Sequence, residues 1–256
     1  MYDLAIQIVN YKTKAYLAEC LAGLVNDLKD SKLKCNINVL DNDSGDDLSD
    51  LKSQYSDVSF YDNDINSGYG GGHNILAKKA EAGYMLLLNP DIKFVELKTI
   101  ERLFNRIDQD KNIKVIGPRL MTAKGDIQWW DHGELHGLIA KIALKSGNSY
   151  WKIQNKVSSV AWISGAAFLI DKKIFDQLGG FDEHFFLYKE EEELCWRVRE
   201  QGGKVIYDPT VKLLHVGGVV AKKTDHMQKS VDFFLDKHFR NKMGYSFFKL
   251  LNKIMH

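Results

Sequence analysis

The chain has 256 residues, of which 45% are hydrophobic, so it can form one large α/β domain or two small ones with a real core. Its 35 Lys and Arg residues nearly balance its 34 Asp and Glu residues, which argues against nucleic acid as a partner. The three cysteines form no Cys-x-x-Cys pair, a pattern that favours a reducing compartment. The start of the chain is unlike a signal peptide and its apolar runs are too short to cross a bilayer, so a cytoplasmic protein is expected.

The first sixty residues alternate between strand and helix patterns. A buried strand is predicted over residues 4–9, and a helix over residues 15–29, where leucines recur at helical spacing. Further strands are predicted over residues 37–40 and 58–61, and the first of these ends in a polar loop rich in aspartate, residues 41–47. Such alternation predicts a right-handed, mainly parallel sheet flanked by helices.

A glycine-rich stretch, residues 63–74, follows the third predicted strand, and a helix is expected over residues 75–81. Glycines before a helix let the backbone approach a ligand closely and leave amide groups free for phosphate, although a flexible loop explains them equally well. The stretch is neither the Gly-x-Gly-x-x-Gly fingerprint after a first strand nor a Walker motif. The dinucleotide-binding and P-loop interpretations are therefore excluded.

An uninterrupted apolar run over residues 85–88 stops at Asn89-Pro90-Asp91. Such a run is typical of a strand covered on both faces, and Pro90 ends it because proline cannot donate to a ladder. Ligands in open α/β sheets lie beyond the carboxyl ends of strands, so Asp91 is a candidate for ligand or metal handling. The alternative is a turn that only ends the strand.

The middle of the chain is less informative. A helix is predicted over residues 99–107, and a strand is predicted to end at residues 115–118. Residues 129–159 mix aromatics and glycines without a clear period, which predicts only a mobile or acceptor-facing loop.

Four consecutive glutamates, residues 190–193, open a predicted helix that ends at Gly202-Gly203. Acidic residues in a first helical turn are favoured by the helix dipole, which explains the run without any function. However, Glu191 shares the i, i+3, i+4, i+7 spacing of Leu194, Cys195 and Val198. This places Glu191 at the head of a buried stripe, where a carboxylate is suited to handling protons.

Two strands are predicted near the end, over residues 204–207, stopping at Asp208-Pro209, and over residues 211–214. His215 directly follows the second strand and lies beside Gly217 and Gly218. This position suits a metal or phosphate ligand as well as a structural histidine. From residue 221 basic and aromatic residues interleave. Helices of that composition lie on an anionic membrane surface, or pack on the domain or on a second copy in a homodimer.

The order of these motifs resembles the family 2 glycosyltransferases, in particular their bacterial rhamnosyltransferase-like and galactofuranosyltransferase-like group. The resemblance covers roughly residues 4–218, and it rests on Val9-Asn10-Tyr11, residues 40–44, residues 66–74, residues 88–91, residues 179–183, residues 185–195 and His215. It implies a GT-A fold over residues 1–220, a Rossmann-like and mainly parallel sheet flanked by helices. Residues 221–256 would then form a basic and aromatic helical extension.

The resemblance also implies an inverting enzyme with a nucleotide-sugar donor and a divalent metal, Mn²⁺ or Mg²⁺. Glu191 corresponds to the catalytic base, and Asp91 with His215 to the metal ligands. The donor side would comprise Asn10, Tyr11, Asp41, Asn66, Gly68, Gly72, Asn74 and Asn89, and the acceptor side Asp182, Glu183 and Glu190. The family usually has Glu-Asp where this chain has Glu190-Glu191, and a carboxylate displaced by about 1 Å can cost roughly a hundredfold in rate.

These features predict transfer of one sugar, with rhamnose from a dTDP donor favoured, to a lipid-linked or growing bacterial surface polysaccharide. UDP-galactofuranose, UDP-galactose and UDP-N-acetylglucosamine are the alternative donors. The enzyme would work in the cytoplasm or on the inner face of the cell membrane. A non-catalytic sugar-nucleotide-binding subunit is the alternative from another class, and a nucleotidyltransferase fits less well because no glycine-rich, basic start follows the first strand.

Overall fold

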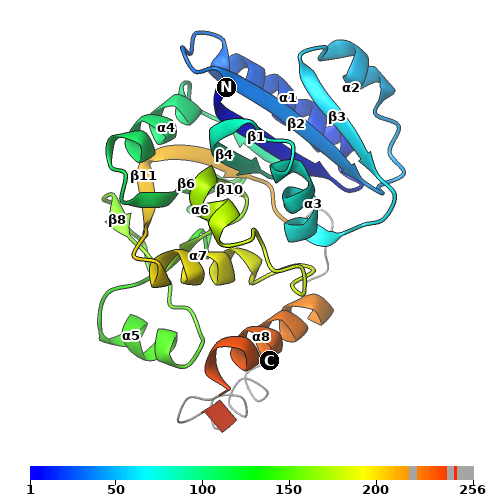
Figure 1. Cartoon of the computed structure of the whole chain (residues 1–256). Helices are drawn as coiled ribbons and strands as arrows, with labels where there is room; N and C mark the ends of the chain where they lie inside the picture. The colour runs from blue at the N-terminus through cyan, green and yellow to red at the C-terminus, as the bar shows by residue number, and fades with distance from the viewer. Residues whose placement is uncertain (219–223, 241–244, 247–256) are drawn as a thin grey trace.

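The computed structural model describes residues 1–218, 224–240 and 245–246 of the chain. Among these residues one mixed sheet holds nine strands, drawn in Figure 1. The strands run in the order β3 (Val58–Asn63), β2 (Cys35–Asn42), β1 (Tyr2–Asn10), β4 (Ala82–Leu88), β10 (Ala167–Asp171), β6 (Ile113–Met121), β11 (Lys204–His215) and β5 (Ile92–Phe94), and β8 (Ser158–Ser159) pairs with β11. β1 to β4 are mutually parallel, as are β6 and β11, whereas β10, β5 and β8 run antiparallel to their neighbours.

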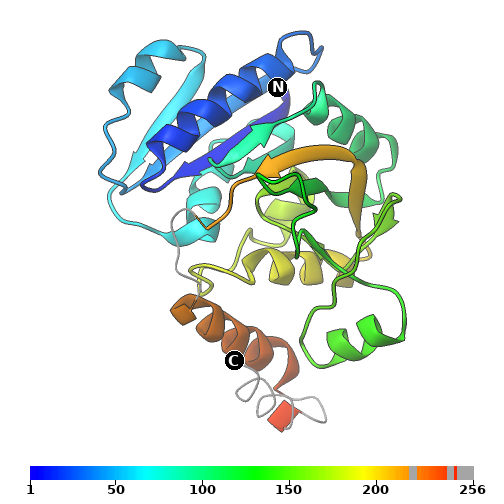
Figure 2. The same ribbon diagram turned by 180° about the vertical axis from the view of Figure 1, so that it is seen from behind.

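Helices cover both faces of this sheet, as Figures 1 and 2 show from opposite sides. Leucine and isoleucine side chains of α1 (Lys14–Leu28) and α4 (Thr99–Gln109), with one leucine of α2 (Ser49–Gln54), pack on one face. Apolar side chains of α6 (Lys172–Gln177) and α7 (Glu190–Glu200) pack on the other, together with the end of α3 (Gly68–Ala77). A small second sheet pairs β7 (His132–Gly133) with β9 (Trp162–Ile163), and α5 (Leu138–Lys145) lies between these two strands in the chain.

The central strand β4 has the two-sided burial that its apolar run predicts. Leu86 and Leu88 belong to the core beneath α1, whereas Met85 and Leu87 belong to the core beneath α7, and each side chain is at most 1% exposed. Alternate residues of a strand point to opposite faces, so both faces must be apolar. The prediction of a buried strand ending before Asn89 is confirmed.

The prediction of two separate strands over residues 204–207 and 211–214 is wrong. β11 is one strand whose register with β6 shifts after Asp208. The carboxylate of Asp208 accepts hydrogen bonds from the amide (2.9 Å) and the hydroxyl (2.6 Å) of Thr210, and this local turn forms a bulge. Proline is tolerated at a bulge, so Pro209 interrupts the ladder without ending the strand.

The boundary predicted for the glycine-rich stretch is also wrong, because α3 begins at Gly68 and includes the other glycines. The first two amide groups of the helix are already bonded: Gly68 N–H donates to Asn66 Oδ1 (2.9 Å) and Tyr69 N–H to the carbonyl of Phe186 (3.1 Å). A β-carbon on Gly68 would lie 2.2 Å from that same carbonyl oxygen. Close packing of α3 therefore accounts for Gly68 without a phosphate.

Gly68→Ala is expected to destabilise the fold far more than Gly45→Ala, and urea unfolding of both variants measures the difference. The two glycines have nearly equal φ angles, +74° and +75°, but no atom lies within 4 Å of the position of a β-carbon on Gly45. The control should therefore lose about 1 kcal/mol from the backbone alone. Gly68→Ala should lose roughly 1–3 kcal/mol more from overpacking. Equal losses would contradict the close approach of Phe186.

The described part of the predicted C-terminal extension is α8 (Thr224–Phe239), which packs on the rest of the protein. Its apolar side chains form one buried cluster with the loop before α7, comprising Phe185, Val231, Phe234, Leu235 and Phe239. Residues 219–223, 241–244 and 247–256 lie outside the described residues. Among the described helices, none combines the length and the hydropathy that crossing a membrane requires.

Residues 129–159 are anchored by a buried carboxylate, Asp131, which is 1% exposed. It accepts hydrogen bonds from the hydroxyl of Tyr207 (2.7 Å) and the indole of Trp151 (3.0 Å), and it contacts His132 Nδ1 at 2.6 Å. Its backbone carbonyl accepts from the amide of Ser164 (2.9 Å). The segment for which the sequence predicts only a loop is thus fixed to β11 and to residues 164–166.

Candidate active site

The donor end of the site is organised by Asn10, which is fully buried at the end of β1. Its amide donates to Asp41 Oδ1 (2.9 Å) and Asp46 Oδ2 (3.0 Å), and its Oδ1 accepts from the hydroxyl of Thr13 (2.8 Å). The same oxygen of Asp46 also accepts from the backbone amides of Thr13 (3.1 Å) and Lys14 (3.2 Å), where α1 begins. Asn10 therefore fixes Asp41 at the shared edge of β1 and β2. Sequence reasoning missed Thr13 and Asp46, although Asp46 lies in the aspartate-rich loop it singled out.

A second asparagine, Asn42, fixes the segment that follows β3. Its side chain is 2% exposed and donates to Asn66 Oδ1 (3.0 Å) and to the carbonyl of Gly68 (3.2 Å), while its Oδ1 accepts from the Ser67 amide (3.2 Å). Asn66 is thereby held at the same sheet edge as Asp41. Tyr11, half-buried directly after β1, begins the neighbouring loop. Asn42 is the organising residue here, and the sequence gives no local signal that distinguishes it from the other asparagines.

Two of the predicted donor residues have structural partners. The amide of Asn74 donates to the carbonyl of Phe181 and to Glu183 Oε1, both at 2.9 Å, and its Oδ1 accepts from the Phe181 amide (2.9 Å). Gly72 faces β1, where an added β-carbon would lie 2.9 Å from Val9. Asn74 therefore joins α3 to the loop that carries Glu183, and Gly72 permits α3 to approach the sheet.

The candidate metal site lies where β5 meets β11. Antiparallel pairing sets Ile92 opposite His215, and this brings Asp91 Oδ1 to 3.3 Å from His215 Nε2. The other oxygen of Asp91 accepts from the amide of Gly217 (2.8 Å), and Asn89 Nδ2 lies 3.3 Å from His215 Nε2. His215, which is distant in the sequence, thus contacts two predicted site residues that follow β4, Asn89 and Asp91.

The partners of His215 leave one ring nitrogen directed at Asp91. Its Nδ1 donates to Gln128 Oε1 (2.9 Å), so Nε2 is the nitrogen that faces Asp91 and that could bind a cation in the neutral ring. Two electron donors facing one another fit a shared Mn²⁺ or Mg²⁺ ion. Among the residues described, no cluster of three or more His, Cys, Asp or Glu side chains adds a further ligand. Mg²⁺ commonly completes such a sparse protein shell with substrate phosphates and water.

The candidate base lies at the start of α7, after two residues with positive φ, Tyr188 (+70°) and Lys189 (+72°). Glu190 is 3% exposed and Glu191 is half-buried, and the Oε2 atom of each is buried without a hydrogen-bond partner among the described residues. Glu190 and Glu193 are buried together with Leu194, Cys195 and Val198, whereas Glu191 is only half-buried. The predicted stripe is therefore less buried at its first position.

Burial shifts both carboxyl groups toward their protonated forms. It raises the pKa of Glu191 to about 7, with a further contribution from the charge of Glu192. Burial and the charge of Glu191 raise the pKa of Glu190 well above its ordinary value. Burial therefore favours the protonated form of Glu190, while Glu191 exchanges a proton near neutral pH, which is the property of a general base poised at its working pH.

Residues 164–166 connect the metal side to the base side. The hydroxyl of Tyr69 donates to the Gly165 carbonyl (2.6 Å), and the Ala166 carbonyl accepts from the Asn89 amide (2.9 Å). Burial and the charge of Glu191 raise the pKa of Tyr69 well above its ordinary value, which reflects their proximity. Sequence reasoning missed Tyr69 and Gly165, although Tyr69 lies in the motif of residues 66–74.

Helix α8 holds the loop that precedes the base. Ser230 donates to the Leu187 carbonyl (2.9 Å), and Lys237 pairs with Asp182 (2.7 Å) and with the fully buried Glu193 (2.6 Å). Asp182, a predicted acceptor-side residue, thus contacts α8. The loop between residues 182 and 187 is tied at both ends before it enters α7.

Comparisons with known proteins identify the family of the chain. The sequence profile described as "Glycosyl transferase family 2" matches residues 5–191. The low-salt glycan biosynthesis hexosyltransferase Agl10 of Haloferax volcanii is 27% identical over 94% of this chain and 74% of its own length. The N-acetylglucosaminyl-diphospho-decaprenol L-rhamnosyltransferase of Mycobacterium tuberculosis is 24% identical over 83% of this chain and 75% of its own. The rhamnosyltransferase WbbL of Escherichia coli K12 is 24% identical over 82% of each.

Solved structures share the fold at low sequence identity. GalNAc-T7 with UDP, GalNAc and Mn²⁺ superposes with a TM-score of 0.68 at 15% identity, covering 92% of this chain and 48% of that one. The mannosyltransferase PcManGT from Pyrobaculum calidifontis with GDP-Man and Mn²⁺ gives 0.62 at 12% identity, covering 94% and 67%. TarS from S. aureus with UDP gives 0.63 at 15% identity, covering 96% and 75%. These neighbours are GT-A enzymes, so the expected GT-A fold is confirmed.

Proposed function

The chain belongs to glycosyl transferase family 2, and on that premise we propose that it transfers one sugar from a dTDP- or UDP-linked donor to a hydroxyl group. The favoured donor is dTDP-rhamnose, and the favoured acceptor is a lipid-linked or growing surface polysaccharide. The proposal rests on one observation. Residues 164–166 contact Asn89, which lies beside the Asp91–His215 pair, and they also contact Tyr69, which lies beside Glu191. Relatives named as rhamnosyltransferases support the choice of sugar.

The reaction assigns one task to each end of the site. Asp91 and His215 would hold a divalent ion, which when bound neutralises charge on a departing nucleotide diphosphate. Asp41, which Asn10 holds in place, would bind the base or ribose of the nucleotide, with Asn66 and Asn89 along the donor. Glu191 would remove the proton of the acceptor hydroxyl as its oxygen forms a bond to the anomeric carbon, and the bond from that carbon to the diphosphate oxygen breaks with inversion.

A second function, a non-catalytic sugar-nucleotide-binding subunit, is favoured by one feature. The chain has Glu190-Glu191 where the family usually has Glu-Asp, and the longer side chain moves the base by about 1 Å. This subunit would bind donor normally without transferring the sugar. UDP-galactofuranose, UDP-galactose and UDP-N-acetylglucosamine are the alternative donors for the catalytic function. The expected inner-membrane location, the extension over residues 221–256 and a homodimer also stay predictions.

Thermal unfolding against a panel of nucleotide sugars and nucleotides, with Mn²⁺, with Mg²⁺ and with EDTA, tests the proposal without a known acceptor. A ligand that binds the folded state at a hundred times its Kd stabilises it by about 2.7 kcal/mol, so the correct donor should raise Tm by several degrees. We expect the largest shift with dTDP-rhamnose and Mn²⁺. Failure of every dTDP and UDP compound would overturn the proposal, and binding without transfer to any acceptor would favour the binding subunit.

A further inference from the structure

Helix α5 presents its apolar side chains to solvent instead of to the core. Leu138, Ile139 and Ile142 are 76%, 59% and 57% exposed, whereas Ala140 is 1% exposed. At 100° per residue the three exposed apolar residues share one side of the helix with Lys141 and Lys145, which are also exposed. We call these five residues the α5 face. In an ordinary surface helix the apolar side is the buried one.

The stretch of chain around α5 carries charge of one sign. Residues 135–170 contain four lysines and no Asp or Glu, although acidic and basic residues balance over the whole chain. Exposed apolar side chains also gather in this stretch. Of the fourteen large hydrophobic residues exposed in the described part of the chain, five lie within residues 135–170: Leu138, Ile139, Ile142, Ile153 and Val157.

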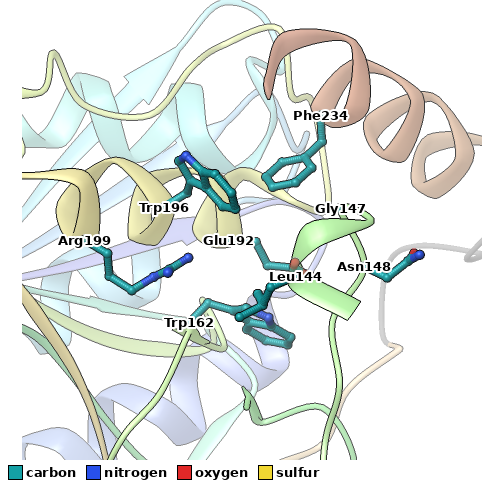
Figure 3. Close-up of a pocket in the computed structure, with 8 residues that line it drawn as sticks. All are labelled: Leu144, Gly147, Asn148, Trp162, Glu192, Trp196, Arg199 and Phe234. Atoms are coloured by element: carbon teal, nitrogen blue, oxygen red, sulfur yellow. The ribbon is translucent and has the colours of Figure 1, made fainter. Parts of the chain in front are cut away.

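The opposite side of α5 is held firmly beside α7. Ser149 donates to Glu192 Oε2 (2.7 Å) and accepts from the indole of Trp162 (2.9 Å). Leu144 faces Trp196 and Glu192 across a void of only about 10 Å³, room for about one water molecule (Figure 3). Figures 1 and 2 both place α5 on the far side of α7 from the sheet. The α5 face therefore points outward, away from α7, the helix whose first turn carries Glu191.

We propose that the α5 face docks the protein on an anionic membrane surface, with its apolar side chains in the headgroup region and its lysines on lipid phosphates. Apolar side chains flanked by lysines are the composition that binds such surfaces. A second copy of the chain fits less well, because stable interfaces use roughly 20–30 residues a side and a two-fold axis would bring like-charged lysines together. The docking is inferred from the exposed residues of the α5 face alone. Only its purpose, which is access to a lipid-linked acceptor, rests on the proposed function.

Flotation of the full chain with vesicles tests the docking directly. Binding is expected to vesicles of phosphatidylcholine with phosphatidylglycerol, and to be far weaker with phosphatidylcholine alone. Each basic residue near an anionic surface strengthens binding roughly fivefold, so the K141Q/K145Q variant should bind on the order of 25-fold more weakly. The L138Q/I139Q/I142Q variant should lose flotation, because the apolar contacts are removed.

Matched controls separate the α5 face from general surface effects. The K29Q/K32Q and V25Q/V95Q/L97Q variants remove exposed lysines and exposed apolar residues elsewhere and should float like the wild type. Equal binding by the α5 and control variants would overturn the docking, as would absence of wild-type flotation. A dimer in sedimentation that the α5 variants convert to monomer, without lipid binding, would assign the face to a second copy instead. Donor-induced thermal shifts should be unchanged in all variants, so failure of the docking is distinguishable from failure of the proposed function.

Discussion

Glu191→Gln is expected to lower the rate of sugar transfer by roughly 10²–10⁴-fold while leaving donor binding intact. The amide keeps nearly the same shape at the start of α7 but cannot accept the acceptor proton. Glu191 lies beside Tyr69 and is assigned to the acceptor proton and not to the donor, so the donor-induced rise in Tm should equal that of the wild type. The measurement is single-turnover transfer together with thermal unfolding in dTDP-rhamnose and Mn²⁺.

The pH profile gives a second test of the same residue. The base must be deprotonated to act, and burial raises the pKa of Glu191 to about 7. The rate should therefore rise with pH through about 7 and level off above it. Glu200→Gln, an exposed substitution at the other end of α7, is the control and should retain both rate and profile. A fully active Glu191→Gln variant would remove Glu191 from the role of base.

Asp91→Asn is expected to remove the part of donor binding that depends on metal. The amide oxygen can still accept from Gly217, so the fold should persist, but the negative charge that would attract the cation is lost. Partners that merely orient a metal ligand contribute 10–100-fold to metal affinity, and loss of a direct ligand should cost at least as much. The Tm shift with donor and Mn²⁺ should fall to the shift with donor and EDTA.

His215→Ala should act in the same direction as Asp91→Asn, because the two side chains face one another at 3.3 Å. Asp57→Asn, an exposed carboxylate outside the site, is the control and should keep the metal-dependent shift. An unchanged shift in both site variants would exclude this pair as the metal ligands. A shift that is insensitive to EDTA even in the wild type would exclude a metal role altogether.

Much of the scaffold follows from local patterns. The apolar run of β4 predicts two-sided burial, and the leucine spacing of α1 predicts its core-facing side, both as found. Asn89-Pro90-Asp91 predicts the end of β4 because proline cannot continue a ladder. The errors occur where tertiary contacts override local chemistry. Gly68 begins α3 because Asn66 and Phe186 bond its first amides, and Pro209 stays within β11 because the Asp208 turn forms a bulge there.

The sequence by itself determined the alternation of strands and helices up to β4, the two-sided burial of β4 and the positions of Asp91, Glu191 and His215 near element ends, because periodicity and strand-ending residues are local properties. Only the tertiary structure decided which ends meet. The register of β5 on β11 brings Asp91 to His215, and residues 164–166 join that pair to Tyr69 beside Glu191. The tertiary structure also decided that the apolar side of α5 faces outward. Burial depends on what packs against a helix, and an amphipathic pattern is the same whether its apolar side faces the core or the solvent.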